Sequence, residues 1–272
     1  MLIFRRYFLK NFYSFISGAL IGVLGGLIGL GGAEFRLPLL NIAFKFNLKS
    51  AIVLNLAVSL VTVAFSLVFR AFEVDILLVW SHSFIVLNIL IGSLYGSYIG
   101  AGLVSKVNET MLKKIVFAFL LLLGIVLMLH SSLENSYSLG FSPLASFILG
   151  IVCGYFIGLA SSMLGVAGGE LIIPTIVLIY GTDIKLAGSL SLLISIPTLL
   201  VSLYKYHKNL GFDPITYNKD FALFMAGGSI IGAFGGVLLL GSTDSLFIEI
   251  FLGCLLILSA FKMLLMKKRN TK

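Results

Sequence analysis

Seven long stretches of this sequence contain no charged residue. They cover residues 11–33, 50–69, 76–105, 115–133, 135–169, 186–204 and 221–243. Each stretch can supply the roughly 17–25 apolar residues that a membrane-spanning helix needs. An eighth candidate, residues 245–266, carries Glu249 and Lys262 near its ends, where a long lysine side chain reaches the membrane surface. The pattern predicts a polytopic, all-α membrane protein.

Composition agrees with that prediction. Hydrophobic residues make up 59% of the 272 residues and charged residues 11%, whereas about 25% of the residues in a soluble protein are charged. The stretches between the candidate helices are too short to build a soluble domain. We therefore expect a single transmembrane domain over residues 1–272 in the cell membrane, with no catalytic lobe outside it.

The two halves of the chain resemble each other. An offset of 136 residues pairs Gly29 with Gly165 and Glu34 with Glu170, so it aligns rare residue types rather than only leucines. The repeats that follow cover about 12–131 and about 143–267. Internal repeats of this size are typical of transporters, whose substrate sites lie where the halves meet.

Each half contains a glycine-rich block that ends in a proline. The blocks read Gly29-Leu-Gly-Gly-Ala-Glu34-Phe-Arg36-Leu-Pro38 and Gly165-Val-Ala-Gly-Gly-Glu170-Leu-Ile-Ile-Pro174. Glycine relaxes the helical backbone and proline removes a donor, so each block is expected to break a helix. The apolar segments that follow, about 38–46 and 174–181, are too short to span alone as straight helices. Each half is therefore predicted to hold four long helices and one short broken or re-entrant helix.

The basic residues predict the orientation, because positively charged loops stay in the cytoplasm. If the short segments cross the membrane, all 19 lysines and arginines lie inside except Arg36, Arg70 and Lys185. If they do not cross, the loop 106–114 is left outside. The first arrangement is favoured and has five crossings per half. It makes the repeats inverted, places both termini in the cytoplasm and puts the connection 131–142 outside.

Three charged residues lie in the breaks. Glu34 and Glu170 occupy matching positions, and an ionisable residue inside a bilayer indicates a function by default. A desolvated carboxylate can bind a proton near neutral pH, which makes proton coupling a prediction. The alternative is that both acids lie near the surface, solvated or paired with a basic residue. Arg36 offers donors suited to an oxyanion or, equally, to an internal ion pair with one of the acids.

Backbone groups and neutral side chains complete the predicted substrate-binding site. A half-helix after a break begins with unpaired N–H groups that favour anions, and glycines let a ligand approach them; the alternative is that the glycines only permit tight packing. Asn55 and Ser59, and the matching Ser191 and Ser195, each recur four residues apart and so share a helix face. They would bind an oxyanion or join helices. The candidate set is Gly29, Gly31, Gly32, Glu34, Arg36, Asn55, Ser59, Gly165, Gly168, Gly169, Glu170, Ser191 and Ser195.

The duplicated block, its closing proline, and the sequences Lys49-Ser-Ala51 and Lys185-Leu-Ala187 resemble the TauE/SafE family of sulfite exporters and related anion transporters. The resemblance covers nearly the whole chain. Ala33 and Ala167 replace two glycines of the family pattern. The resemblance implies a secondary transporter or exporter of a small sulfur-containing anion, of the sulfite or organosulfonate class, with alternating access around the paired breaks.

Two other functions compete with transport. A passive anion channel on the same scaffold would differ in its kinetics alone. An intramembrane enzyme would need a nucleophile with its base, or a metal cluster, and neither a His-Glu-x-x-His nor a Gly-x-Ser-x-Gly motif is present. We therefore expect no enzyme activity, catalytic residue, metal site or cofactor. The expected partners are the anion and the lipid bilayer, without nucleic acid, and a homodimer is left open.

Overall fold

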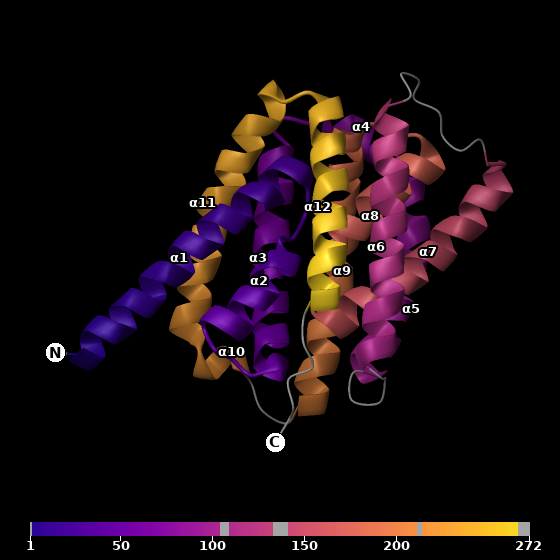
Figure 1. Cartoon of the computed structure of the whole chain (residues 1–272). Helices are drawn as coiled ribbons and strands as arrows, with labels where there is room; N and C mark the ends of the chain where they lie inside the picture. The colour runs from indigo at the N-terminus through magenta and orange to yellow at the C-terminus, as the bar shows by residue number, and fades with distance from the viewer. Residues whose placement is uncertain (1, 104–108, 133–140, 211–213, 266–272) are drawn as a thin grey trace.

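The computed structural model describes residues 2–103, 109–132, 141–210 and 214–265. Every regular element in these ranges is helical, which confirms the all-α class (Figure 1). Most of the predicted outside connection and the basic residues 267–269 lie beyond the described ranges. The elements in chain order are α1 (Leu2–Ile28), α2 (Ala33–Pro38), the π-helix η1 (Leu39–Ala43), α3 (Leu48–Arg70), α4 (Ile76–Ser81), α5 (Ser83–Leu103), α6 (Glu109–Ser132), α7 (Pro143–Leu164), α8 (Gly169–Tyr180), α9 (Ile184–Leu210), α10 (Pro214–Tyr217), α11 (Lys219–Ser242) and α12 (Ser245–Leu265).

Six helices within the described residues are long and apolar enough to cross a membrane, so the chain is a multi-pass membrane protein. They are α1, α3, α5, α7, α9 and α11. The other two predicted spans coincide with α6 and α12, whose described apolar stretches are the shorter segments Leu120–Leu129 and Ser245–Phe261. The charge-free stretch 76–105 holds two helices, the short α4 and the candidate span α5. Asp75 starts α4 by accepting a hydrogen bond from the backbone N–H of Leu77 at 2.8 Å.

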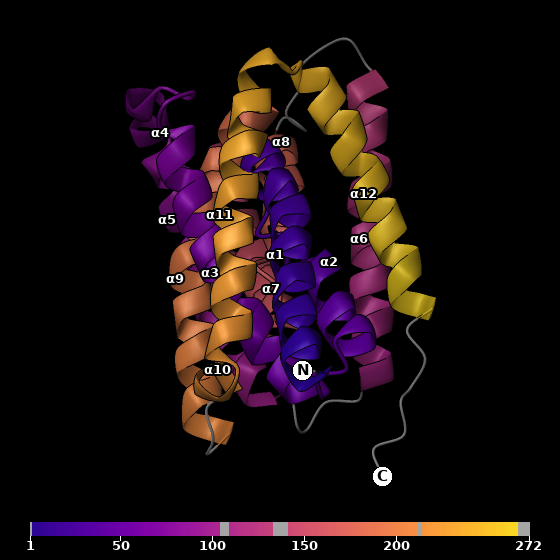
Figure 2. The same ribbon diagram turned by 90° about the vertical axis from the view of Figure 1, so that its left-hand side faces the viewer.

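Glycines lie in the two most extensive helix contacts, which join α1 with α11 and α5 with α7. The first pair lies side by side in Figure 2. A side-chain carbon at Gly22 would collide with the carbonyl oxygen of Ser229 in α11. One at Gly158 would collide with the carbonyl oxygen of Ser93 in α5, which is the same pair shifted by the repeat offset. The backbones approach this closely because glycines such as Gly22 and Gly158 have no side chain at the contact, as in other membrane helix pairs.

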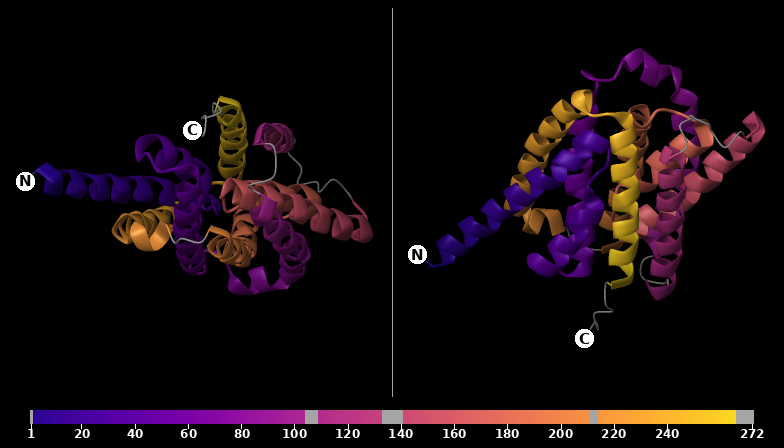
Figure 3. Two further views of the ribbon diagram at one scale, coloured as in Figure 1. Left: turned by 90° about the horizontal axis from the view of Figure 1, so that it is seen from below. Right: turned by 45° about the horizontal axis from the view of Figure 1, so that its top comes forward.

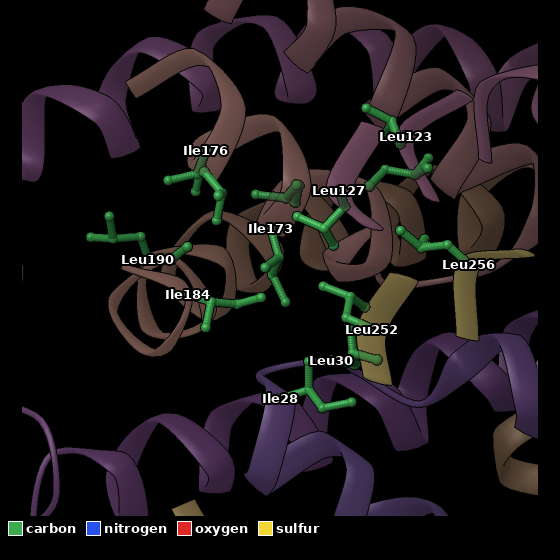
Figure 4. Close-up of a cluster of buried hydrophobic side chains, with 14 of the residues drawn as sticks. Ile28, Leu30, Leu123, Leu127, Ile173, Ile176, Ile184, Leu190, Leu252 and Leu256 are labelled. Atoms are coloured by element: carbon green, nitrogen blue, oxygen red, sulfur yellow. The ribbon is translucent and has the colours of Figure 1, made fainter. Parts of the chain in front are cut away.

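Helices α6 and α12 form a third pair. They pack on each other and reach the rest of the molecule chiefly through α8 and α9, and they lie together in the view from below (Figure 3). Leu127 of α6 and Leu252 of α12 gather with Ile173 of α8 and Leu30 of the first glycine block (Figure 4). The apolar core therefore includes the segments on either side of the breaks.

The chain breaks at the glycines and not at the prolines. The segments 29–32 and 165–168 separate α1 from α2 and α7 from α8, whereas Pro38 and Pro174 lie inside helices. Pro38 has φ −61° and ψ −37°, which is helical, so it removes one hydrogen bond without turning the chain. The expectation that each short helix begins after its proline was therefore wrong, because each begins directly after its glycines.

Candidate functional site

The two breaks contact each other in the interior of the molecule. A side-chain carbon placed on Gly169 would lie 3.1 Å from the carbonyl oxygen of Gly29 and 3.3 Å from the Cα atom of Leu30. One placed on Gly31 would collide with the side chain of Ala167. The fold therefore brings together residues from two blocks that are far apart in the sequence, and the predicted site residues of the breaks share one region.

Four break glycines have a left-handed backbone. The φ angles are +93° for Gly29, +65° for Gly32, +68° for Gly165 and +78° for Gly168. They form two pairs related by the repeat offset. A residue with a side chain costs roughly 1–2 kcal/mol in this conformation. These four glycines are therefore required by the turn that each break makes, in addition to the close packing seen at Gly31.

Helix α3 of the first half and helix α9 of the second half each donate a hydrogen bond to the break of the other half. Asn55 of α3 donates from Nδ2 to the carbonyl oxygen of Gly165 at 2.7 Å and to that of Ala33 at 2.9 Å. At the matching position in α9, the hydroxyl of Ser191 donates to the carbonyl oxygen of Gly29 at 2.8 Å and lies 2.9 Å from that of Gly188. The two side chains thus form crossed braces between the halves.

Arg36 is fully buried and surrounded by hydroxyl groups. Its Nη1 donates to Ser59 Oγ at 2.8 Å, and its Nη2 donates to Thr62 Oγ1 at 3.2 Å and to Ser229 Oγ at 3.4 Å. Nη2 also lies 3.4 Å from the carbonyl oxygen of Gly31, and Nε has no partner among the described residues. The distribution of basic residues predicts that Arg36 lies outside. The structure instead places this cation in the interior, beside the first break.

The two acids begin the helices that follow the breaks. Glu34 is half-buried in the first turn of α2, and Glu170 is 6% exposed in the first turn of α8. A carboxylate in a first helical turn is favoured by the positive end of the helix dipole. The structure thus buries Glu170, while Glu34 lies close enough to act electrostatically on Arg36.

The second half does not reproduce the arginine cluster. Ser195, which matches Ser59, is also buried, but Ile172 takes the position that Arg36 has in the first half. The predicted residues Ser59 and Ser195 therefore differ in their surroundings. Of the two serines, Ser59 accepts a hydrogen bond from an arginine, whereas no such bond is described for Ser195.

Arg70 is the residue that the sequence reasoning missed. The distribution of basic residues predicts that it lies outside, yet it ends α3 and is only 1% exposed. Its Nη2 donates to the carbonyl oxygen of Leu27 at 3.3 Å, and its guanidinium lies against Gly29 and Gly188. The assignment failed because a charge at the end of an apolar stretch is normally solvated.

The repeat contains a signal that could have identified Arg70. The offset aligns Arg70 with Tyr206, which donates from its hydroxyl to the carbonyl oxygen of Ser162 at 3.0 Å. It also aligns Gly188 with Ile52, whose side chain approaches Gly165. Arg70 of the first half thus faces Gly188 of the second half. At the equivalent positions, Tyr206 belongs to the second half and Ile52 to the first.

Comparisons with known proteins agree on a transporter family. A family model described as sulfite exporter TauE/SafE matches residues 4–127 and 149–272. A probable membrane transporter protein of Methanocaldococcus jannaschii is 30% identical over 164 residues, so the match spans 58% of this chain and 58% of that relative's length. No solved structure matches the chain.

Proposed function

We propose, because this chain belongs to the sulfite exporter TauE/SafE family, that it is a secondary transporter of a small sulfur-containing anion of the sulfite or organosulfonate class. The family and the relative are membrane transporters, which points away from an enzyme. The single observation that carries the proposal is the burial of Arg36 among hydroxyl groups where the two breaks meet.

The chemistry of Arg36 suits an oxyanion. A guanidinium is always charged at working pH, and its planar set of donors matches two oxygens of one ligand. Burying such a charge is costly unless an opposite charge accompanies it. The hydroxyls of Ser59, Thr62 and Ser229 now accept from Arg36. Those of Ser59 and Ser229 can rotate to donate to an arriving oxygen, whereas Thr62 already donates to the carbonyl oxygen of Val58 at 2.8 Å. A bound anion would therefore gain several donors and compensate the buried charge.

The crossed braces support alternating access. Asn55 and Ser191 each join one half to the break of the other half, so a movement of the halves would shift both breaks together.

We further propose that the halves are inverted repeats with both termini in the cytoplasm of a cell-membrane protein. Supporting this, α1 begins at the lower end of the molecule and α7 at the upper end in Figure 1.

We also propose that the acids of the breaks couple transport to protons. Glu34 and Glu170 stand in the first turns of the helices that follow the breaks, and a desolvated carboxylate can bind a proton near neutral pH. Replacing both with glutamine should remove the response of transport to an imposed pH gradient. Unchanged pH-driven flux in Glu34→Gln and Glu170→Gln would exclude this role.

Flux into proteoliposomes tests the proposal. Sulfite, thiosulfate, sulfate and a short organosulfonate should be offered separately, under pH gradients of each sign. We expect saturable flux of at least one sulfur anion, and about a tenfold or greater loss in Arg36→Gln, because a hydrogen bond to a charged group contributes roughly 1.5–3 kcal/mol. The exposed Lys208 provides the control, since Lys208→Gln removes a positive charge from the surface.

Three results would contradict the proposal in different ways. Equal flux in Arg36→Gln and wild-type protein would show that Arg36 does not bind the transported anion. Flux that neither saturates nor responds to a gradient would favour a passive channel on the same scaffold. Turnover of a thiol or lipid substrate without any gradient would favour an enzyme.

A further inference from the structure

A second buried arginine lies apart from the cluster around Arg36. Arg70 stands at the end of α3 that lies beside α4, and two of its three side-chain nitrogens, Nε and Nη1, have no hydrogen-bond partner among the described residues. Its one described bond, to the carbonyl oxygen of Leu27, is 3.3 Å long. Buried donors are nearly always satisfied in folded proteins, so an unsatisfied pair on a cation calls for an explanation.

The surroundings of Arg70 leave room for its own guanidinium. Its Nη1 lies so close to Gly29 and Gly188 that a side-chain carbon on either glycine would collide with it. At the place that the repeat offset makes equivalent, Ile52 of the first half stands in the position of Gly188, and the neutral Tyr206 of the second half stands in the position of Arg70. The two glycines therefore leave room for the Arg70 guanidinium at a place where the equivalent contact holds an isoleucine.

A carboxylate lies near the same place. Asp183, in the connection between α8 and α9, is exposed and acts electrostatically on Arg70. Its Oδ1 accepts a hydrogen bond from the backbone N–H of Lys185 at 2.8 Å, which fixes it at the start of α9. Asp183 is thus a negative group on the surface side of Arg70, where it would compete electrostatically with an anion.

We infer that Arg70 is a second anion-binding site, which takes a small oxyanion between the Arg36 cluster and the surface at the α4 end of the molecule. Nε and Nη1 supply the donors, and Gly29 and Gly188 leave room for the guanidinium that carries them. Gly29 also accepts from Ser191, so the second site adjoins the crossed braces. The ligand class rests on the proposed transport function, whereas binding at Arg70 is measured without transport.

Thermal denaturation of the purified full-length protein over a range of sulfite concentrations tests the site. Arg36→Gln disables the central cluster, so the stabilisation by sulfite that remains in this variant is expected to belong to Arg70. In the double variant Arg36→Gln with Arg70→Gln, that stabilisation should disappear. Sulfate and chloride series distinguish oxyanion binding from a general salt effect.

Two further variants keep the test decisive if Arg70→Gln does not fold. Asp183→Asn keeps the helix cap and removes the competing charge, so the half-saturating sulfite concentration should fall about three- to tenfold, as expected for an interaction of roughly 1 kcal/mol. Arg70→Lys keeps the positive charge but loses the planar set of guanidinium donors, so the half-saturating sulfite concentration should rise.

The outcomes separate this inference from the proposed function. If Arg36→Gln alone abolishes stabilisation, or if Asp183→Asn and Arg70→Lys both match the wild type, the site at Arg70 is excluded while transport through Arg36 can stand. If sulfite stabilises through Arg70 but no sulfur anion crosses the membrane in proteoliposomes, the proposed function fails and the binding site stands. Stabilisation by chloride equal to that by sulfite would overturn the assignment to oxyanions.

Discussion

Replacing Asn55 with leucine should destabilise the protein by about 2–4 kcal/mol. Leucine has the same branched arrangement of side-chain heavy atoms but donates nothing, so the carbonyl oxygen of Gly165 loses a 2.7 Å bond inside the molecule and that of Ala33 loses one of 2.9 Å. A buried polar group left without its partner costs about 1–3 kcal/mol. Ala33 begins α2, where its carbonyl also belongs to the helical ladder, so Gly165 carries the larger share.

One gain reduces this cost. Asn55 Oδ1 is buried and accepts no hydrogen bond from any described residue, so leucine removes an unsatisfied acceptor together with the donor. The sum for two lost bonds, about 2–6 kcal/mol from the cost per group, is therefore an upper range. The lower half of that range is the expected result.

The measurement is the free energy of unfolding of the purified protein in detergent, obtained by denaturant titration. Ser66→Ala is the matched control, because Ser66 lies on the same helix α3 and its buried hydroxyl has no partner among the described residues. It should change stability by less than about 0.5 kcal/mol or increase it. If Asn55→Leu is no more destabilising than this control, the crossed braces do not join the halves.

Three more predictions address the seam, the turn and the orientation. Gly22→Ala should cost about 1–3 kcal/mol because it overlaps the α11 backbone, whereas Gly235→Ala, with open space around it, should be nearly neutral in the same unfolding assay. Gly168→Ala should cost at least about 1–2 kcal/mol, since φ is +78° there; a Tm equal to that of the wild type would refute the need for a left-handed turn. In a chain without its two cysteines, Phe72→Cys and Tyr217→Cys, both at exposed positions, should react with an impermeant thiol reagent from opposite sides of the membrane. Labelling of both from one side would contradict the inverted arrangement.

The long helices and the breaks could be predicted because each depends on local sequence. Absence of charge over about 20 residues is enough to place a helix in a bilayer. The repeat offset added the paired breaks, and the shared face of Asn55 and Ser59 followed from their spacing along a helix. The prolines misled the reasoning, because Pro38 and Pro174 stand in positions where the proline φ angle fits a helix that has already begun.

Burial of the arginines could not be predicted from local sequence. Arg36 and Arg70 were counted as outside residues, since charge at the end of an apolar stretch is usually solvated. Their burial depends on partners from elsewhere in the chain. Ser229, which bonds Arg36, is 193 residues away, and Gly188 makes room for Arg70 from the other half. Contacts across the two halves thus decide where these charges lie.

The seam between α1 and α11 also constrains how the protein is made. Ser14 of α1 donates to the carbonyl oxygen of Phe221 in α11 at 3.0 Å, across 207 residues of intervening chain. During synthesis, α1 therefore enters the bilayer long before its neighbour exists, with its row of glycines facing lipid or a temporary companion. Completion of the first half must wait for the last helices to emerge. An insertion factor that shelters small-residue faces would thus matter more for this chain than for a bundle whose neighbouring helices are consecutive.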